Sequence, residues 1–488
     1  MTRKIIFFLG LIVLLSAFLR FYHLGNNYIF GFDEEYQATY AMTLVKDIHP
    51  IWIGVSASFL DYYLGPYFTY FSAFWLMLSQ GDPLMTAYVA ATAGVITTIV
   101  IFFVGWKFFN LTAGVVSSLL YGGLSLIVFY DQKYWNPMFV PLIVLLMFTS
   151  LLLIKRSPWW WLLYSATVGA IFETDLAPLP LVLIGVWYFI KGKYFLNKRL
   201  TLGCLAVFLL FYWPLLVFDY HHNFSNLTVL ARYSQQAKQS GAKFDPKSKL
   251  MSVADTMGRF WYLKPGAPNA DELNIFCNSQ RTYPSPWVSG ISAILLLYFI
   301  STSIKTGKRA HKMLVYFLVV SLGFYLIYTG GSFEYYLHGF ITLFTLTVGI
   351  LVSQLNKKLQ PAALILVAVI LVLGFNTVLN SSDKYSLAPK KKLIAEVMSV
   401  VGPNSFSIDQ MGTCHIYEGW RYLFKIYGKT PSMSFTDQNF AWLYPQEVND
   451  GSLNYHVILS EYGVTPDRDL SGYVNINEGG FSAYIKKN

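Results

Sequence analysis

Hydrophobic runs long enough to cross a membrane recur along most of the chain. A helix that crosses a hydrocarbon core about 30 Å thick needs roughly 20 mostly apolar residues. Residues 5–22 form the first such run, directly after Arg3 and Lys4. No small-residue cleavage site follows it, so we interpret it as an uncleaved first span. Further runs of about this length lie at 84–106, 112–130, 138–154, 201–218, 287–304, 313–329, 338–353 and 361–379.

Two further apolar segments cannot be read as ordinary single spans from their length alone. The positions of nearby basic residues show how often each crosses the membrane, because cytoplasmic loops retain Lys and Arg. The segment 159–190 is too long for one helix, is interrupted at 173–175 and has basic residues at both ends. We predict a hairpin of two short helices with a recessed turn. Counting 64–79 as a span would turn Lys107 to the wrong side, so we assign it to an aromatic-rich helix at the outer interface.

Composition supports a membrane protein and changes how the net charge is interpreted. Only 13% of the 488 residues are charged, against roughly 25% in a soluble domain. The net charge of +10 would suggest a nucleic-acid partner in a soluble protein, but 15 of the 36 basic residues fall in short loops on one predicted side. We therefore predict eleven spans in the cell (plasma) membrane, a cytoplasmic N-terminus, an extracytoplasmic C-terminus and no nucleic-acid partner.

Three longer segments are predicted outside the membrane: the first outer loop (23–82), a long loop (219–286) and a tail (381–488). The basic long loop is interpreted as solvated, with contact to an acceptor or to anionic headgroups as the alternative. The expected fold is an all-α polytopic membrane domain over 1–380, followed by a small extracytoplasmic α/β domain in the tail. The tail's predicted elements are a helix at 389–402 and strands at 405–409, 455–460 and 481–487.

Acidic residues near the membrane are the most informative polar positions in so apolar a chain. Asp33, Glu34 and Glu35 follow the first span directly. In a helix, neighbouring side chains point about 100° apart, so one carboxylate can face a cavity while the next supports it. The spacing leaves two interpretations open, in which Asp33 either caps a helix over 36–46 or acts as a catalytic base.

Further polar residues occupy three other predicted outer turns. Glu173 and Asp175 interrupt the short hairpin, either as a hydrophilic turn or as functional acids in a recessed site. Lys133 is the only basic residue of its outer loop, so it is either a snorkelling lysine or a partner for a lipid phosphate. His338 lies among aromatic residues, which favours packing over ligand binding.

Motifs for nucleotides and metals are missing from the sequence. No phosphate-binding loop or G-x-G-x-x-G pattern occurs, so a nucleotide-driven mechanism has no support. The carboxylates and the histidine are compatible with a divalent metal, although their spacing matches no known ligand set. Cys277 and Cys414 both fall in predicted outer segments and are candidates for a disulfide.

Several of these motifs resemble the GT-C glycosyltransferases, specifically the family-39-like enzymes. That group includes the dolichyl-phosphate-mannose protein mannosyltransferases and the bacterial lipid A aminoarabinose transferases. The resemblance covers most of residues 1–200 and weakens beyond. The motifs that carry it are Phe32-Asp33-Glu34, Gly65-Pro66-Tyr67, Lys133-Tyr134-Trp135-Asn136-Pro137, the hairpin with Glu173 and Asp175, and Tyr335-Tyr336-Leu337-His338. The sequence departs from the family where Lys133 replaces an Arg and Glu173-Thr174-Asp175 replaces a Gln/His pattern.

The resemblance implies an inverting hexosyl or pentosyl transferase of the cell envelope. It would move one sugar from a polyprenyl-phosphate donor to a hydroxyl of a protein, lipid or glycan acceptor at the outer face of the membrane. Asp33 would be the general base, with Glu34 orienting or polarising it. The donor's phosphate and sugar would contact Lys133, Asn136, Glu173, Asp175, Tyr336 and His338. No cofactor is certain, and a divalent metal stays open.

Two other functions remain as alternatives. A secondary transporter would use Glu173 and Asp175 as an ion or proton relay, but the chain lacks the repeated halves that such proteins usually have. A catalytically inactive assembly protein would bind a partner through the tail. The Asp33-Glu34 pair argues mildly against that second alternative.

Overall fold

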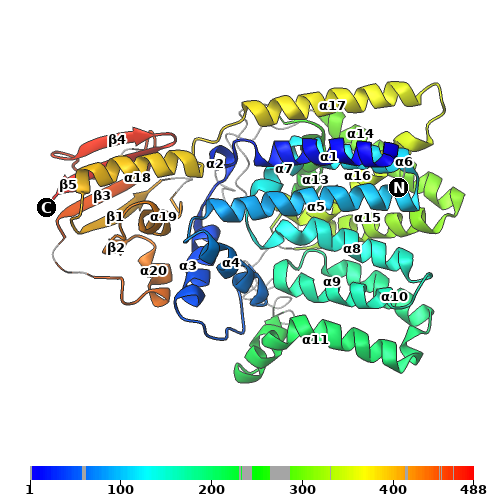
Figure 1. Cartoon of the computed structure of the whole chain (residues 1–488), viewed down its shortest axis with the longest axis horizontal. Coiled ribbons are helices and arrows are strands. Elements are labelled where there is room, and N and C mark those ends of the chain that lie inside the picture. The colour runs from blue at the N-terminus through cyan, green and yellow to red at the C-terminus, as the bar shows by residue number, and fades with distance from the viewer. Residues whose placement is uncertain are drawn as a thin grey trace.

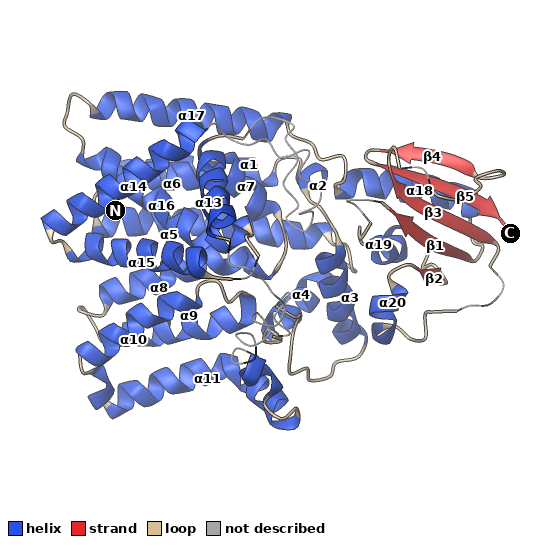
Figure 2. Cartoon of the chain, turned by 180° about the vertical axis from the view of Figure 1, so that it is seen from behind, coloured by secondary structure: helices blue, strands red, loops and turns tan. Residues whose placement is uncertain are grey.

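A layer of long helices occupies one end of the molecule, and a small sheet lies at the other (Figures 1 and 2). This computed structural model describes residues 3–57, 62–229, 232, 245–263, 286–329, 331–412, 416–449, 451, 453–464 and 466–488. The predicted pair of Cys277 and Cys414 lies outside the described residues.

Apolar helices build most of the chain. Seven helices of the described residues are long and apolar enough to cross a membrane, or eight if one bent pair counts as a single span. The total of eleven spans stays a prediction. The helical layer as a whole, including helices too short to be counted among these seven, consists of α1 (Arg3–Phe21), α5 (Leu84–Phe108), α6 (Leu111–Gly123), α7 (Ser125–Gln132), α8 (Val140–Leu153), α9 (Trp160–Thr174), α10 (Val182–Lys191), α11 (Lys198–His221), α14 (Pro286–Thr306), α15 (Arg309–Ile327), α16 (His338–Gln354) and α17 (Gln360–Asn380).

The predicted hairpin of two short helices is confirmed. Helix α9 ends at Thr174, and α10 begins at Val182 after the 3-10 turn η3 (Leu179–Leu181). The turn between them lies at the end of the helical layer that faces the sheet (Figure 1). Another short 3-10 turn, η4 (Tyr194–Leu196), joins α10 to α11 at the opposite end.

The run 112–130, predicted as one span, is broken into α6 and α7, which meet at 61°. Gly122 and Gly123 precede the break, and a side chain at Gly123 would collide with Leu371 of α17. The break leaves carbonyl groups without helical partners, and Arg20 of α1 satisfies two of them. Its Nη2 donates to the Tyr121 carbonyl at 3.1 Å, and its Nη1 donates to the Gly122 carbonyl at 2.9 Å. The continuous hydropathy of the run conceals this break.

A buried ion pair completes the junction. Arg20 is fully buried, and its Nε and Nη2 donate to one oxygen of Asp131 at 2.9 and 2.6 Å. Asp131 lies at the end of α7, so the pair fixes the direction in which the chain continues toward residues 132–137.

Shorter elements cover the end of the helical layer that faces the sheet. The predicted interfacial helix forms as α4, whose 12 residues are too short for a span. The interpretation of the long loop as solvated is wrong for α13, because Lys249 and Arg259 of this amphipathic helix are only 3% and 5% exposed. These elements are α2 (Leu24–Asn27), α3 (Phe32–Lys46), α4 (Tyr67–Leu78), η2 (Asn136–Phe139), α13 (Pro246–Trp261) and η6 (Glu334–Leu337).

The C-terminal segment (381–488) forms a five-stranded mixed sheet in the order β2-β1-β3-β5-β4. The predicted helix and three predicted strands are confirmed as α18, β1, β3 and β5. Strands β2 and β4 escaped prediction because β2 has two residues and β4 alternates around polar side chains. The elements are α18 (Leu387–Val401), β1 (Phe406–Met411), α19 (Trp420–Tyr427), β2 (Met433–Ser434), α20 (Asp437–Phe440), η7 (Ala441–Leu443), β3 (Tyr455–Glu461), β4 (Val474–Glu478) and β5 (Phe481–Lys487).

The C-terminal segment shares one hydrophobic core with the first loop. Lys390 is fully buried, donates to the Phe30 carbonyl at 2.7 Å and pairs with Glu418. Tyr422 donates from its hydroxyl to the Gly81 carbonyl at 2.8 Å. Because main-chain and side-chain bonds join the two parts around this core, the sheet is held in place against α3 and α4.

The buried Arg20–Asp131 pair yields a stability prediction. Asp131→Ala leaves a buried guanidinium without its counter-charge, which we expect to cost about 3–5 kcal/mol of unfolding free energy. Thermal and denaturant unfolding in detergent micelles measures the loss. Asp409→Ala is the matched control, because it removes the half-exposed pair with Arg468 and should cost about 1 kcal/mol or less. Equal losses in the two variants would contradict this account of the junction.

Candidate functional site

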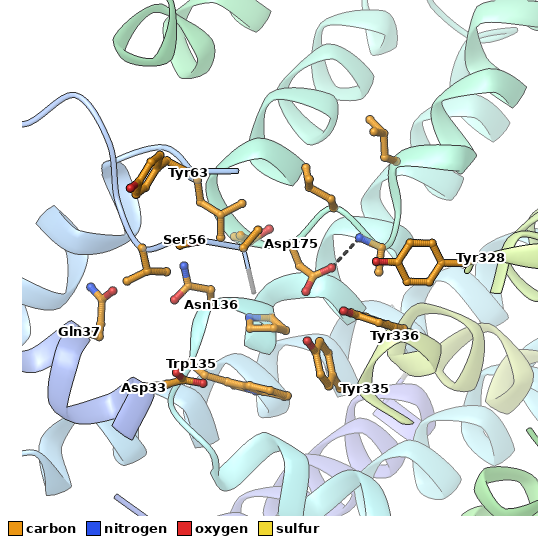
Figure 3. Close-up of a pocket in the computed structure, with 18 of the residues that line it drawn as sticks. Asp33, Gln37, Ser56, Tyr63, Trp135, Asn136, Asp175, Tyr328, Tyr335 and Tyr336 are labelled. Carbon is orange, nitrogen blue, oxygen red and sulfur yellow. Dashed lines mark hydrogen bonds between the residues drawn. The ribbon is translucent and has the colours of Figure 1, made fainter. Parts of the chain in front are cut away.

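A cavity of about 1040 Å³ lies where the first loop, the connections between helices and the C-terminal segment meet (Figure 3). The only charged side chains among its described lining residues are Asp33 and Asp175. Asn136 and Tyr336, both predicted from the sequence, also line it. Four of the eight predicted site residues therefore meet in one cavity, and Glu34, Lys133, Glu173 and His338 are absent from its described lining.

The first turn of α3 sends its three acids in different directions. Asp33 is exposed and lines the cavity, whereas Glu34 and Glu35 are 4% and 1% exposed. The expectation that neighbouring carboxylates separate in this way is confirmed. The alternative of a helix over 36–46 with Asp33 as its cap is wrong, because α3 begins at Phe32 with Gly31 as the N-cap residue.

Glu34 is the third residue of α3 and supplies the side-chain acceptor of a capping box at the start of this helix. Its Oε2 accepts a hydrogen bond from the Gly31 amide at 3.1 Å, while its Oε1 lies 3.9 Å from Nζ of Lys133. The Lys133 ammonium also lies 4.3 Å from the ring centre of Trp135, which lines the cavity. Lys133 is therefore held between a buried carboxylate and the cavity wall.

Glu35 points away from the cavity and joins α3 to the C-terminal segment. Its Oε1 accepts a hydrogen bond from the backbone amide of Tyr422 at 2.9 Å. Burial raises the pKa of Glu35 to about 7, opposed by the Tyr422 amide and by the nearby charge of Arg421. This carboxyl group is therefore a structural contact whose charge changes near neutral pH.

Glu173 lies at the junction of α9 and α4. Its Oε2 accepts a hydrogen bond from the Tyr67 amide at 2.8 Å, at the N-terminus of α4, where a carboxylate is favoured. Gly65 packs so closely against this carboxylate that an added Cβ would collide with it. Glu173 thus fixes the first loop to α9, and the ion-relay alternative loses one of its two acids to this contact.

Asp175 occupies the turn after α9 and faces the cavity, with Asn136 nearby (Figure 3). One of its oxygens accepts a hydrogen bond from the Ala177 amide at 2.6 Å, which holds the side chain in place. Asn136 begins the 3-10 turn η2 and is fixed by the following proline. The two polar groups therefore come from separate connections and converge on the same space.

The aromatic–histidine motif divides between the cavity and the core. Tyr335 and Tyr336 line the cavity, as Figure 3 shows. His338 is 6% exposed, and its ring centre lies 3.9 Å from that of Tyr130. This position agrees with a packing role for His338.

Sequence reasoning did not select Lys249 and Arg259, the two buried basic residues of α13, as site residues. Lys249 lies 5.0 Å from the ring centre of Tyr325 and 5.2 Å from that of Tyr328, and both rings line the cavity. Arg259 pairs with Glu334 at 3.4 Å. Burial lowers the pKa of Lys249 to about 8. The amphipathic pattern of 246–261 is the signal that would have revealed this helix.

The cavity does not assemble a recognisable metal site. No group of three or more His, Cys, Asp or Glu side chains arranged to hold an ion occurs in the described part of the chain.

The contact between Glu173 and α4 can be tested by substitution. Glu173→Ala leaves the half-buried Tyr67 amide without its acceptor, which we expect to cost about 1 kcal/mol of unfolding free energy. Glu173→Gln is the matched control, because its side-chain oxygen can still accept that hydrogen bond. Thermal unfolding in detergent micelles measures both variants. Native stability in Glu173→Ala would show that the contact is dispensable.

Glu35 predicts a pH dependence of stability. A carboxyl pKa raised from 4.5 to about 7 means that the folded chain favours the protonated form. Its contribution to stability is complete below about pH 4.5 and is lost as the pH rises through 7, a change of about 3 kcal/mol. Glu35→Gln keeps the acceptor for Tyr422 without the titration. The unfolding free energies of the native chain and of Glu35→Gln should therefore diverge between pH 5 and 8, with the variant more stable at pH 8. The same pH dependence in both proteins would contradict the assignment.

Comparisons with known proteins identify the fold. No protein-family model and no curated protein matches the chain. The crystal structure of ArnT from Cupriavidus metallidurans bound to undecaprenyl phosphate is similar, with a TM-score of 0.61, 12% identity, and 98% of this chain and 97% of that chain covered. Its apo state gives a TM-score of 0.65 at 13% identity, with the same coverage.

A second protein shows the same arrangement over most of this chain. The archaeal oligosaccharyltransferase AglB from Archaeoglobus fulgidus, in complex with an inhibitory peptide and a dolichol-phosphate, gives a TM-score of 0.51 and 11% identity. The match covers 94% of this chain and 69% of that chain. ArnT and AglB both have the GT-C fold, so the chain is a multi-pass membrane protein with that fold.

Proposed function

We propose that the chain is a membrane glycosyltransferase that moves one sugar from a polyprenyl-phosphate carrier to an acceptor hydroxyl. The observation that carries the proposal is a single cavity with Asp33 in one wall and apolar, outward-facing residues of α10 and α15 in another. ArnT bound to undecaprenyl phosphate and AglB bound to a dolichol-phosphate support a lipid-linked donor.

The apolar side of the cavity suits an isoprenoid chain. Leu183 of α10 and Ile327 of α15 line the cavity and are 69% and 68% exposed. In a bilayer, exposed apolar side chains on such helices face lipid tails. A carrier lipid can then keep its tail among lipids while its phosphate and sugar enter the cavity.

Two cations behind the aromatic lining supply charge for the carrier's phosphate. Lys133 lies against Trp135, and Lys249 lies against Tyr325 and Tyr328. Positive groups fixed near a departing phosphate stabilise the charge that develops there. A bound phosphate would also offset the burial that lowers the pKa of Lys249. Glu34 then acts as a positioning residue for Lys133.

Asp33 provides the base for the transfer. The acceptor oxygen attacks the anomeric carbon while the bond from that carbon to the phosphate oxygen breaks. Asp33 takes the hydroxyl proton, and the polyprenyl phosphate leaves with the bonding electrons. Attack opposite the phosphate inverts the anomeric centre, by analogy with inverting glycosidases. Asp175, Asn136 and Tyr336 are placed to contact the hydroxyls of the donor sugar.

The distribution of basic residues supports an extracytoplasmic cavity. The N-terminus and the helix ends and connections that carry the 15 basic residues of the predicted inner loops lie at the end of the helical layer opposite the sheet (Figure 1). By the positive-inside rule, that end is cytoplasmic. The N-terminus is then cytoplasmic, and the cavity and the C-terminal segment are extracytoplasmic.

Asp33→Asn tests the base assignment. Purified protein receives radiolabelled polyprenyl-phosphate sugars and a membrane extract, and label transfer is measured. We expect the variant to lose about 10²- to 10⁴-fold in turnover, because the amide cannot take the proton. Asp47→Asn, the same change at the exposed C-cap of the same helix, should keep native turnover. Transfer at the native rate in Asp33→Asn would remove Asp33 as the base.

A further inference from the structure

The C-terminal segment supplies part of the cavity through α20 and η7. Asn439, Phe440 and Trp442 all belong to the lining. The rings of Phe440 and Trp442 contact aromatic residues spaced four apart on α3. We call the resulting set the aromatic wall, and its members are Phe32, Tyr36, Tyr40, Phe440 and Trp442.

The rings of the aromatic wall contact one another in sequence. The ring centre of Phe440 lies 4.8 Å from that of Phe32 and 5.5 Å from that of Tyr36. Tyr40 lies 6.1 Å from Trp442, which is 62% exposed. The aromatic wall therefore continues from beside Asp33 to a tryptophan with a solvent-accessible face.

Polar contacts hold the segment that carries Phe440 and Trp442. Asp437 accepts hydrogen bonds from the Ser434 amide at 2.6 Å and from the Tyr444 hydroxyl at 3.0 Å. Arg421 of α19 pairs with Asp437 at 3.1 Å and is 3% exposed. This part-buried network holds α20 in place before any ligand binds, which reduces the entropy lost on binding.

A polar group beside the aromatic wall points to a ligand. Gln37 of α3 lines the cavity near Asp33 and is 4% exposed (Figure 3). Its Nε2 donates to Ser72 at 3.0 Å, but its Oε1 is buried with no hydrogen-bond partner among the described residues. An acceptor atom left in this state is costly unless a ligand donates to it.

We propose that the aromatic wall binds a neutral saccharide, which is the acceptor of the transfer; this inference rests on the proposed function. A sugar ring presents an apolar C–H face that stacks on the electron-rich face of an aromatic ring. Its hydroxyls reach Gln37 and Asn439, and one of them reaches Asp33. The C-terminal segment is then the acceptor-recognition part of the enzyme.

The surroundings favour a saccharide over a polypeptide. An extended peptide is commonly bound through main-chain hydrogen bonds along a free strand edge. The aromatic wall lies instead on α3, α20 and η7, which are helical and present no strand edge. The described lining offers no cation to an anionic acceptor and only Asp33 and Asp175 as charged groups.

Binding measured without donor tests the aromatic wall. The full chain in detergent micelles is applied to an array of neutral oligosaccharides and to a library of Ser/Thr-containing peptides, and the affinities of hits are measured by saturation-transfer NMR. We expect saccharide binding that weakens about tenfold or more in Trp442→Ala. Trp442→Phe keeps an aromatic face and should retain most of the affinity.

Two controls separate a loss of stacking from other effects. Trp159→Ala removes another exposed tryptophan, at the opposite end of α9 from Asp175, and should bind saccharides like the native chain. Thermal unfolding of each variant checks that it is folded. Peptide binding in place of saccharide binding, no saccharide binding at all, or native affinity in Trp442→Ala would overturn the inference.

Hydrolysis of the donor by water distinguishes this inference from the proposed function. If the chain releases sugar from polyprenyl phosphate but binds no saccharide, the transferase proposal stands and the acceptor assignment falls. If saccharides bind through Trp442 but no donor is cleaved, the proposed function fails, and with it the role of the saccharide as acceptor.

Discussion

Consecutive side chains on a helix point about 100° apart, and the structure of the site depends on this constraint at the first turn of α3. Asp33 enters the cavity, Glu34 caps the helix beside Lys133, and Glu35 holds the C-terminal segment through Tyr422. The three acids therefore have three surroundings and, on the proposed function, three roles. The first turn of α3 therefore contacts the cavity through Asp33, Lys133 through Glu34, and the C-terminal segment through Glu35.

Two buried polar contacts bring the other cavity elements to α3. Arg20 satisfies the broken junction of α6 and α7 and pairs with Asp131, which directs the chain toward Asn136. Glu173 fixes the start of α4 to the end of α9, beside Asp175. Loss of one partner costs stability in each contact, because it leaves either the buried Arg20 guanidinium or the half-buried Tyr67 amide unpaired. They determine where the polar side chains converge within an otherwise apolar helical layer.

The sequence predicts the elements better than it predicts their junctions. Long apolar runs and the short hairpin are predictable because hydropathy and basic residues report directly on span length and orientation. The break before Ser125 is concealed, since the run stays apolar through it. The placement of Glu173 against Tyr67 and the entry of Trp442 into the cavity depend on contacts between residues far apart in the chain, which no local pattern records.

A comparison of the isosteric variants Asp33→Asn, Glu34→Gln and Glu35→Gln tests the division of roles along α3 most directly. The measurement is kcat for sugar transfer at saturating donor, with each variant shown to be folded at the assay pH. The account predicts that only Asp33→Asn loses more than about 100-fold, while the other two keep kcat within about tenfold. A loss in Glu34→Gln or Glu35→Gln as large as that in Asp33→Asn would contradict it.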